Sequence, residues 1–258
     1  MEIDWKLAKT ITLWHYEELI AKVLGVFSYT FVQEHCNHDM DQAESYARRT
    51  LDYLQKPGEK AFLHQIETNL QKLKAQSVTN WLDLVHRVES REKCEGFLVA
   101  SGLPFEELLH TQNYLFRWVL PFKHPLKEYI QPGEETYLRL LTQRGIKSNL
   151  DILEGGRSRA GRATLSSETG IPEPFLLELT HRADISRLPY VRGKTVLHLC
   201  GGGYDTVEKL ANADLERIEA NMAAYYQRIG KTSADYKAVI PLYWMVGGAR
   251  VLPKIIET

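Results

Sequence analysis

The sequence contains few cysteines and no long apolar run. Its three cysteines, among 258 residues, are an odd number at wide spacing. They predict neither a disulfide framework nor a four-thiolate zinc site, and a reducing compartment explains them most simply. No run reaches the ~18 apolar residues of a membrane span. Glu2 and Asp4 are acidic where a signal peptide carries a basic region. We therefore expect a soluble, cytoplasmic protein.

The chain also lacks an excess of charge of either sign. It has 32 Lys and Arg residues against 33 Asp and Glu residues, for a formal net charge of −1. The chain as a whole is therefore not a polybasic nucleic-acid binder. Hydrophobic residues make up 44% and charged residues 25%, which excludes a disordered chain, a collagen and a coiled-coil rod. The length allows one or two domains.

Charge is nevertheless distributed unevenly along the chain. Residues 138–258 contain 17 Lys and Arg against 13 Asp and Glu, whereas residues 1–137 contain 15 against 20. A change of sign between halves indicates two modules with different surfaces. A proline-containing turn at residues 131–133 lies near the change, and proline interrupts helices. We therefore predict an acidic domain at residues 1–131 and a basic domain at residues 132–258.

The first half shows helical periodicity with no competing alternation of polar and apolar residues. We expect one long helix over residues 5–36, which Gly25 weakens without ending it. Further helices are expected to begin at Asp39, Ser77 and Pro104, because these residue types favour helix starts. Short connections between such helices favour antiparallel packing, so the first half predicts a helical bundle.

The second half contains an internal repeat. Residues 141–148 and 199–206 each read as leucine, three residues, glycine, apolar residue, charged residue and hydroxyl residue. In such a unit the glycine ends one helix in a left-handed turn and the Ser or Thr caps the next. Further helix-start signals lie at residues 205–208 and 232–235. We expect the paired copies to pack together, which makes the whole chain all-α.

This half also resembles known helical families. The motif residues run Leu188-Pro189-Tyr190-Val191-Arg192-Gly193, then Leu197-His198-Leu199, then Gly203-Tyr204-Asp205-Thr206-Val207-Glu208-Lys209-Leu210. They resemble a helix-hairpin-helix unit, and residues 169–187 resemble domain-of-unknown-function family 4332. The resemblance covers roughly residues 138–256. It implies a tandem helix-hairpin-helix variant without enzymatic activity.

One departure from the helix-hairpin-helix pattern bears on function. Hairpins of this type that hold DNA usually read glycine–apolar–glycine, which lets backbone N–H groups approach a phosphate. Tyr190 and Arg192 occupy the two glycine places here. A Cβ atom at either place obstructs that approach, although the Arg192 side chain can still contact a phosphate.

Basic residues supply a candidate site for an anionic partner. Residues 155–162 contain three arginines and no acid on a glycine-rich backbone, which can lay guanidinium groups along phosphates or along a carboxylate-rich partner. The alternative is a solvated loop in which Arg162 packs its stem against the next helix. The candidate residues for nucleic acid or another anionic partner are Arg157, Arg159, Arg162, Arg192 and Lys194.

Aromatic residues cover more than one face of two expected helical segments in the first half. Such a helix is either buried nearly all round or meets a partner with its second face. Aromatic residues are common anchors of protein interfaces. The candidate interface residues are Trp14, Phe27, Phe31, Tyr114 and Trp118.

Metal and catalytic sites have weaker signals. Residues 34–39 contain five possible metal ligands, which His15, His64 and Glu67 could complete inside a bundle. The alternative is a polar helix end and inter-helix turn. We therefore predict no metal ligands and no cofactor.

The three cysteines show no local nucleophile signature, so we expect structural thiols. The glycines at 201–203 would form a phosphate loop only after a strand, but the hairpin pattern predicts a helix there. The sequence therefore favours a non-catalytic interaction or scaffold protein that binds a protein partner or a second copy of itself. The alternatives are a nucleic-acid backbone binder and a metal-dependent enzyme.

Overall fold

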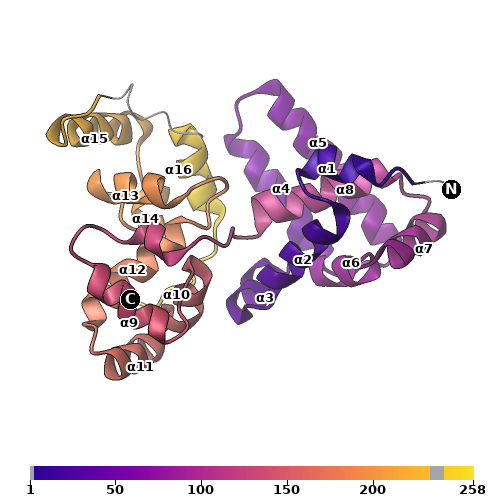
Figure 1. The fold of residues 1–258 in the computed structure, drawn as a ribbon. Coiled ribbons are helices and arrows are strands. Elements are labelled where there is room, and N and C mark those ends of the chain that lie inside the picture. The colour runs from indigo at the N-terminus through magenta and orange to yellow at the C-terminus, as the bar shows by residue number, and fades with distance from the viewer. Residues whose placement is uncertain (1–2, 233–240) are drawn as a thin grey trace. The chain divides into compact units, whose positions relative to one another are not determined.

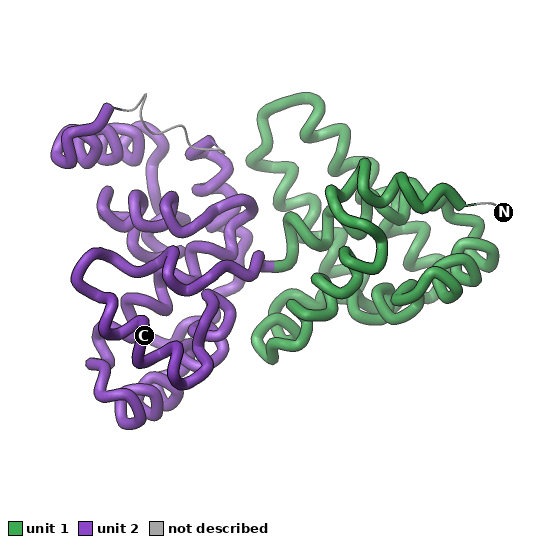
Figure 2. The backbone as a smooth tube through the Cα atoms, in the orientation of Figure 1, with its two compact units in different colours: residues 1–120 green, residues 121–258 purple. Residues whose placement is uncertain are grey.

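The computed structural model describes residues 3–232 and 241–258, and these residues form helices without strands. The predicted all-α class is therefore confirmed. The chain divides into two compact units, residues 1–120 (unit 1) and residues 121–258 (unit 2), as Figure 2 shows. Within the described ranges no helix is both long enough and apolar enough to cross a bilayer.

Unit 1 consists of eight α-helices followed by a π-helical turn (Figure 1). Their bounds are α1 Lys6–Thr12, α2 Tyr16–Phe27, α3 Thr30–Cys36, α4 Met40–Tyr53, α5 Pro57–Ala75, α6 Trp81–Arg87, α7 Arg91–Ser101, α8 Phe105–Tyr114 and η1 Leu115–Val119. The core of the unit is apolar and aromatic, with Trp81 and Tyr16 among its largest fully buried side chains.

The long helix expected over residues 5–36 is three helices. Leu13 adopts a left-handed conformation with φ +75°, and its N–H donates to Lys9 O at 3.0 Å to close α1. Ser28 ends α2, where its hydroxyl donates to Gly25 O at 2.8 Å. Gly25 itself lies inside α2. The prediction of one helix was wrong because a left-handed leucine, which costs ~1–2 kcal/mol, leaves no compositional signal.

Helix starts in unit 1 follow the sequence signals in two of three cases. Asp39 caps α4 by accepting from Gln42 N at 2.8 Å, and Pro104 immediately precedes α8. Ser77 is not a cap, because it lies in a left-handed turn with φ +57°. Asn80 caps α6 instead by accepting from Asp83 N at 2.9 Å.

Unit 2 begins with a 3-10 turn and continues through eight α-helices in the described residues (Figure 1). Their bounds are η2 Leu126–Tyr129, α9 Glu135–Gln143, α10 Asn149–Gly156, α11 Arg159–Thr169, α12 Glu173–Ile185, α13 Gly193–Gly201, α14 Val207–Ala211, α15 Leu215–Arg228 and α16 Leu242–Val251. The long helix α12 packs against α10, α11 and α13, and therefore lies at the centre of the unit.

The compact units divide at Leu120, earlier in the chain than the boundary expected near residue 131. Leu126 and Tyr129 are fully buried. Leu126 N donates to Lys147 O at 2.8 Å, and Tyr129 O accepts from Arg182 Nη1 at 2.9 Å. The segment before residue 131 therefore belongs to unit 2, and the sequence signal there marks a turn within that unit.

Three turns of unit 2 share a local geometry that suits the repeat seen in the sequence. In each, a residue with positive φ is followed by a buried apolar or aromatic residue. The pairs are Gly145–Ile146 (φ +83°), Tyr190–Val191 (φ +62°) and Gly203–Tyr204 (φ +93°), with φ given for the first residue. Tyr190 thus adopts the conformation that glycine adopts in the other two turns.

The helices after the two glycine turns start at hydroxyl caps. Ser148 Oγ accepts from Asp151 N at 3.2 Å, and Thr206 Oγ1 accepts from Lys209 N at 3.0 Å. The cap of α14 is therefore Thr206 and not Asp205. The helix-start signal at residues 232–235 lies, apart from Thr232, outside the described residues.

Candidate functional site

The α12–α13 hairpin brings Arg192 and Lys194 to the surface of unit 2. Arg192 is the N-cap residue of α13, but no side chain caps this helix. The N–H groups of residues 193–195 have no partners inside the helix, and they lie at the positive end of its dipole. Arg192 and Lys194 are exposed, and neither side chain makes a hydrogen bond or ion pair in the described part of the chain.

Gly193 fixes the position of this hairpin by close packing. A Cβ atom added to Gly193 would lie 2.2 Å from Glu128 O. Only glycine therefore lets the first turn of α13 contact the backbone at η2. This glycine serves the packing of the hairpin, whereas the two places expected to hold phosphate-binding glycines carry Tyr190 and Arg192.

Arg192 and Lys194 border a hollow of about 930 Å³ in unit 2, which we call the hairpin hollow. Its cationic side is formed by Arg192, Lys194 and Lys231, and its carboxylates are Glu128, Glu178 and Asp205. Two of these carboxylates are engaged: Glu178 accepts from Arg182, and Asp205 lies 2.6 Å from Lys209 Nζ. The hollow therefore offers three cations beside three carboxylates, two of which are already paired.

The pKa of His198 reflects the positive charge around the hairpin hollow. Burial is the largest cause that lowers the pKa of His198, and the charges of Lys194 and Lys231 lower it further. The two ammonium groups thus disfavour protonation of the same imidazole. An anion in the hairpin hollow would reduce that repulsion.

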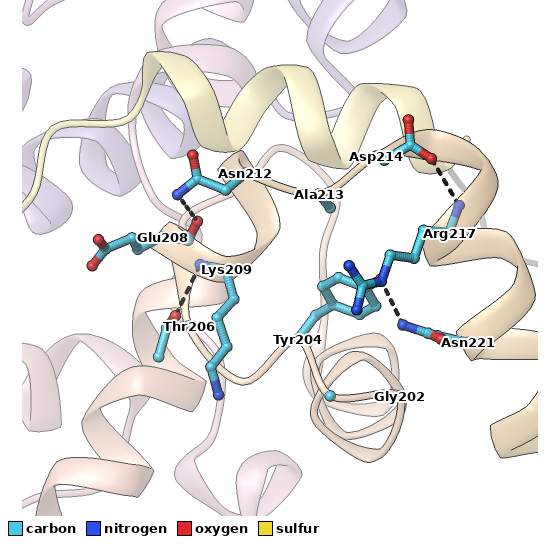
Figure 3. Close-up of a pocket in the computed structure, with 11 residues that line it drawn as sticks. Gly202, Tyr204, Thr206, Glu208, Lys209, Asn212, Ala213, Asp214, Arg217 and Asn221 are labelled. Atoms are coloured by element: carbon cyan, nitrogen blue, oxygen red, sulfur yellow. Dashed lines mark hydrogen bonds between the residues drawn. The ribbon is translucent and has the colours of Figure 1, made fainter.

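A second hollow, of about 650 Å³, lies beside the α13–α14 turn (Figure 3). Asn221 of α15 donates from Nδ2 to the Tyr204 hydroxyl at 3.0 Å. Arg217, also on α15, has an exposed side chain without an ion pair among the described residues. Glu208 and Asp214 also line this hollow, so its charge is mixed. The sequence analysis did not identify these residues.

The expected arginine loop is a short turn between two helices. Helix α10 continues to Gly156 and α11 begins at Arg159. Arg162 is only 4% exposed, and its guanidinium donates to Gly156 O at 2.8 Å and to Glu257 O at 2.6 Å. Burial lowers the pKa of Arg162. Arg162, one of the residues predicted to contact an anionic partner, is therefore covered in this conformation, whereas Arg159 in the same segment is exposed.

Residues 254–258, which we call the tail, lie across the arginine turn (Arg157–Arg162). Glu257 Oε2 accepts from Arg159 N at 2.9 Å, and Glu257 N donates to Arg157 O at 2.9 Å. The Arg159 guanidinium donates to the main-chain oxygen of Thr258. The guanidinium groups of Arg159 and Arg162 thus contact the chain's own tail, and Arg157 contacts it through its main-chain oxygen. The side chains of Arg192 and Lys194 remain exposed.

The aromatic residues predicted at a protein interface are largely covered. Phe27, Phe31, Tyr114 and Trp118 are buried, with Phe31 and Tyr114 completely so. Trp14 is half-buried, and the cations of Lys22 and Arg117 lie over its ring at 5.7 and 5.2 Å. Phe27, Phe31, Tyr114 and Trp118 are therefore packed within the chain in this conformation, whereas Trp14 is partly exposed.

The residues considered as possible metal ligands do not gather in the described part of the chain. No group of three or more His, Cys, Asp or Glu side chains in the described ranges is placed to hold a metal ion. His64 Nδ1 lies 3.1 Å from Glu67 Oε2, and Glu67 also accepts from Arg48. All three cysteines are free thiols, and burial raises the pKa of Cys94 and of Cys200 to about 11 in each case.

The sequence analysis missed a buried ionic centre in unit 2. Arg182 is 1% exposed and donates to both carboxylate oxygens of Glu134, at 2.6 and 2.9 Å. Asp184, near the end of α12, and Arg187, just beyond the helix, form a buried pair at 2.6 Å. The available signal was the occurrence of charged residues on the apolar face of an expected helix, where they require partners.

Comparison with known proteins gives one match. No curated protein and no solved structure matches the chain. Residues 131–239 match the model of a family described as a domain of unknown function, DUF4332. This match lies within unit 2, and it supports the resemblance seen in the sequence of the C-terminal half. The C-terminal half of the chain is thus similar to a family whose function is unknown.

Proposed function

We propose that the protein is a non-catalytic binding protein that holds the phosphate backbone of a nucleic acid at the α12–α13 hairpin. One arrangement supports the proposal. The first turn of α13 has no side-chain cap, and it is flanked by the exposed side chains of Arg192 and Lys194, which have no partners in the described part of the chain. Helix N-termini and basic side chains are the usual ligands of phosphate.

The departure from a glycine–apolar–glycine hairpin shapes the proposed contact. The Cβ of Arg192 limits how closely a phosphate approaches the backbone, so the Arg192 and Lys194 side chains supply most of the contact. Contacts to phosphate fix the position of a nucleic acid but carry no base sequence. Binding is therefore expected to be independent of sequence and to weaken as salt concentration rises. In this proposal the paired turns of unit 2 act as helix-hairpin-helix units.

The alternative, a scaffold that binds a protein partner or a second copy of itself, has less support. The sequence favours it in part because of aromatic residues on helices of the first half, and of these Phe27, Phe31 and Tyr114 are buried. A protein partner would have to use other surfaces. Mass photometry of the purified chain tests self-association directly, because a dimer has twice the mass of a monomer.

A filter-binding titration tests the proposal. Single- and double-stranded DNA and RNA of mixed sequence are titrated with the full chain at 50 and 200 mM salt, concentrations between which phosphate contacts lose much of their affinity. We expect R192A/K194A to bind about tenfold or more weakly at the lower salt. The slope of the logarithm of its binding constant against the logarithm of salt concentration should decrease in magnitude by nearly two, because about one counterion is released per phosphate contact.

The matched control is K60A/R139A, which removes the same charge at two exposed positions without ion pairs in the described residues. It should bind within about twofold of the parent chain, since it leaves the hairpin contacts intact. Failure of the parent chain to bind any nucleic acid at 50 mM salt would overturn the proposal. So would equal binding by the parent chain and R192A/K194A.

A further inference from the structure

The geometry points to a second binding site in unit 2, at the arginine turn. We propose that the tail occupies this site as an intramolecular ligand, and that the site accepts an acidic peptide of another chain in the same extended pose when the tail leaves. The arginine turn shares no residue with the α12–α13 hairpin. The two proposals therefore stand or fall separately.

The tail carries a carboxylate into a built anion site. Helix α11 has 11 residues, and its first N–H, that of Arg159, donates to Glu257 Oε2 at 2.9 Å. Ser158 caps the same helix by accepting from Gly161 N at 3.0 Å. A carboxylate at this end is stabilised by the helix dipole. The occupied site shows that the arginine turn can hold a carboxylate.

The contacts on either side of this carboxylate are those of a bound peptide. Glu257 N donates to Arg157 O at 2.9 Å, and Glu257 O accepts from Arg162 Nη2 at 2.6 Å. Ile255 and Ile256 are buried. Main-chain bonds supply affinity that does not depend on sequence, whereas the isoleucines and the glutamate supply selectivity. The site therefore fits a segment of two apolar residues followed by an acid.

The arginine turn carries more positive charge than the tail neutralises. The guanidinium groups of Arg159 and Arg162 both contact the tail, but the tail offers the one acidic side chain of Glu257 and adds the exposed cation of Lys254. A peptide that replaces the lysine with an acid removes one repulsion and adds one attraction. Such a peptide is expected to bind more tightly than the chain's own tail sequence.

Departure of the tail would also leave Arg162 without one of its acceptors. Arg162 would keep its contacts with Gly156 O and Arg157 O but lose the main-chain oxygen of Glu257. A buried cation that loses an acceptor is costly, which favours recapture of a peptide carbonyl at this position. A hollow of about 510 Å³, bordered by Arg159 and the tail, lets an incoming peptide meet the site at its edge.

The observations favour a peptide over a nucleic acid at this site. A phosphate backbone can replace the carboxylate at α11, but it has no N–H to donate to Arg157 O and no side chains for the positions of Ile255 and Ile256. Nucleic-acid binding at the arginine turn is therefore an alternative that the same experiment detects.

The experiment is a fluorescence anisotropy titration with labelled, end-blocked peptides. The probes are the sequence of residues 252–258 (LPKIIET), the same peptide with Lys254→Glu, and the same peptide with Glu257→Lys. The proteins are the full parent chain and the full-length variant I255D/I256D, in which buried carboxylates expel the tail. We expect I255D/I256D to bind LPKIIET at least tenfold more tightly than the parent chain, because the intramolecular competitor is gone.

The remaining titrations identify the class of ligand. The Lys254→Glu peptide should bind I255D/I256D more tightly than LPKIIET, and the Glu257→Lys peptide should not bind. Adding R159E to I255D/I256D should abolish binding. A labelled oligothymidylate serves as the nucleic-acid probe, and its affinity is compared between the parent chain and I255D/I256D because both keep the hairpin. A gain in affinity of I255D/I256D for the oligothymidylate, with no gain for the peptides, would overturn the proposal.

A second variant keeps the test decisive if I255D/I256D does not fold. Glu257 is exposed, so E257K changes the charge of the tail without placing a carboxylate in the core. A folded E257K chain should gain peptide affinity in the same direction. Equal peptide binding by the parent chain and a folded tail variant, or no binding by either, would overturn the proposal.

Discussion

Arg182 is a buried cation of unit 2 that requires partners for its charge. Its guanidinium is 1% exposed and is held by Glu134 and by Tyr129 O. Removing one partner of a buried ion pair leaves the other partner without its counter-charge. We expect R182M to lower the free energy of unfolding by about 3 kcal/mol in urea denaturation. Exposed Arg139, which has no partner in the described residues, is the control, and R139M should change it by less than about 0.5 kcal/mol.

His124 makes the stability of unit 2 depend on pH. Its side chain is 7% exposed, and burial lowers its pKa from the ordinary 6.5. The unfolded chain therefore takes up the proton first. The stabilising contribution of neutral His124 is present above the unfolded pKa and is lost as pH falls through the lower folded pKa. His38, His181 and His198 shift in the same direction.

We therefore expect the free energy of unfolding to fall between pH 7 and pH 5, and to fall less steeply in H124Q. Urea denaturation at pH 7, 6 and 5 measures both slopes. Glutamine keeps a polar side chain of similar reach but does not titrate. A decline in H124Q as steep as that of the parent chain would contradict a contribution from His124.

At the scale of the helix, Gly193 tests how α13 is positioned, and Gly96 of α7 serves as its control. A Cβ at Gly193 would overlap Glu128 O, whereas a Cβ at Gly96, inside α7, meets nothing within 4 Å. We expect G193A to destabilise the protein by roughly 2 kcal/mol through overpacking. G96A should stabilise it by roughly 0.5–1 kcal/mol, because alanine favours a helix interior. Thermal and urea denaturation give both signs, and a stabilised G193A would contradict the close approach.

Helix ends were predictable where one residue type determines the local geometry. The carboxylate of Asp39 and the left-handed glycines Gly145 and Gly203 act within a few residues, so their effects are visible in the sequence. The breaks at Leu13 and Ser28 were not predictable. Leucine favours right-handed conformations, so nothing in the sequence around Leu13 signals its left-handed turn. The sequence thus predicts helix ends with a capping residue or a glycine better than ends without one.

The candidate site shows the same limit over longer distances. Arg192 and Lys194 lie at the surface, as their place in a hairpin predicts. Arg162 is instead buried by Glu257, which lies 95 residues further along the chain. The aromatic residues Phe27, Phe31 and Tyr114 are buried as well. An apolar or basic stretch reveals that a side chain needs a partner, but the partner is chosen by the fold of the whole unit.

For the whole molecule, the boundary between the units has a measurable consequence. Leu126 and Tyr129 are fully buried, and Tyr129 O accepts a hydrogen bond from Arg182. A fragment of residues 132–258 loses both side chains and this acceptor. Burial of two large side chains contributes about 3–6 kcal/mol, which is a large part of the ~5–15 kcal/mol that stabilises a domain.

We therefore expect the fragment of residues 121–258 to unfold in one cooperative transition, and the fragment of residues 132–258 to be largely unfolded or to melt far lower. Far-UV circular dichroism during heating and urea titration distinguishes the two, because both fragments contain the same α-helices. Equal midpoints would mean that residues 121–131 add nothing to unit 2. In that case the change of charge near residue 131 would mark the boundary better than the packing of Leu126 and Tyr129 does.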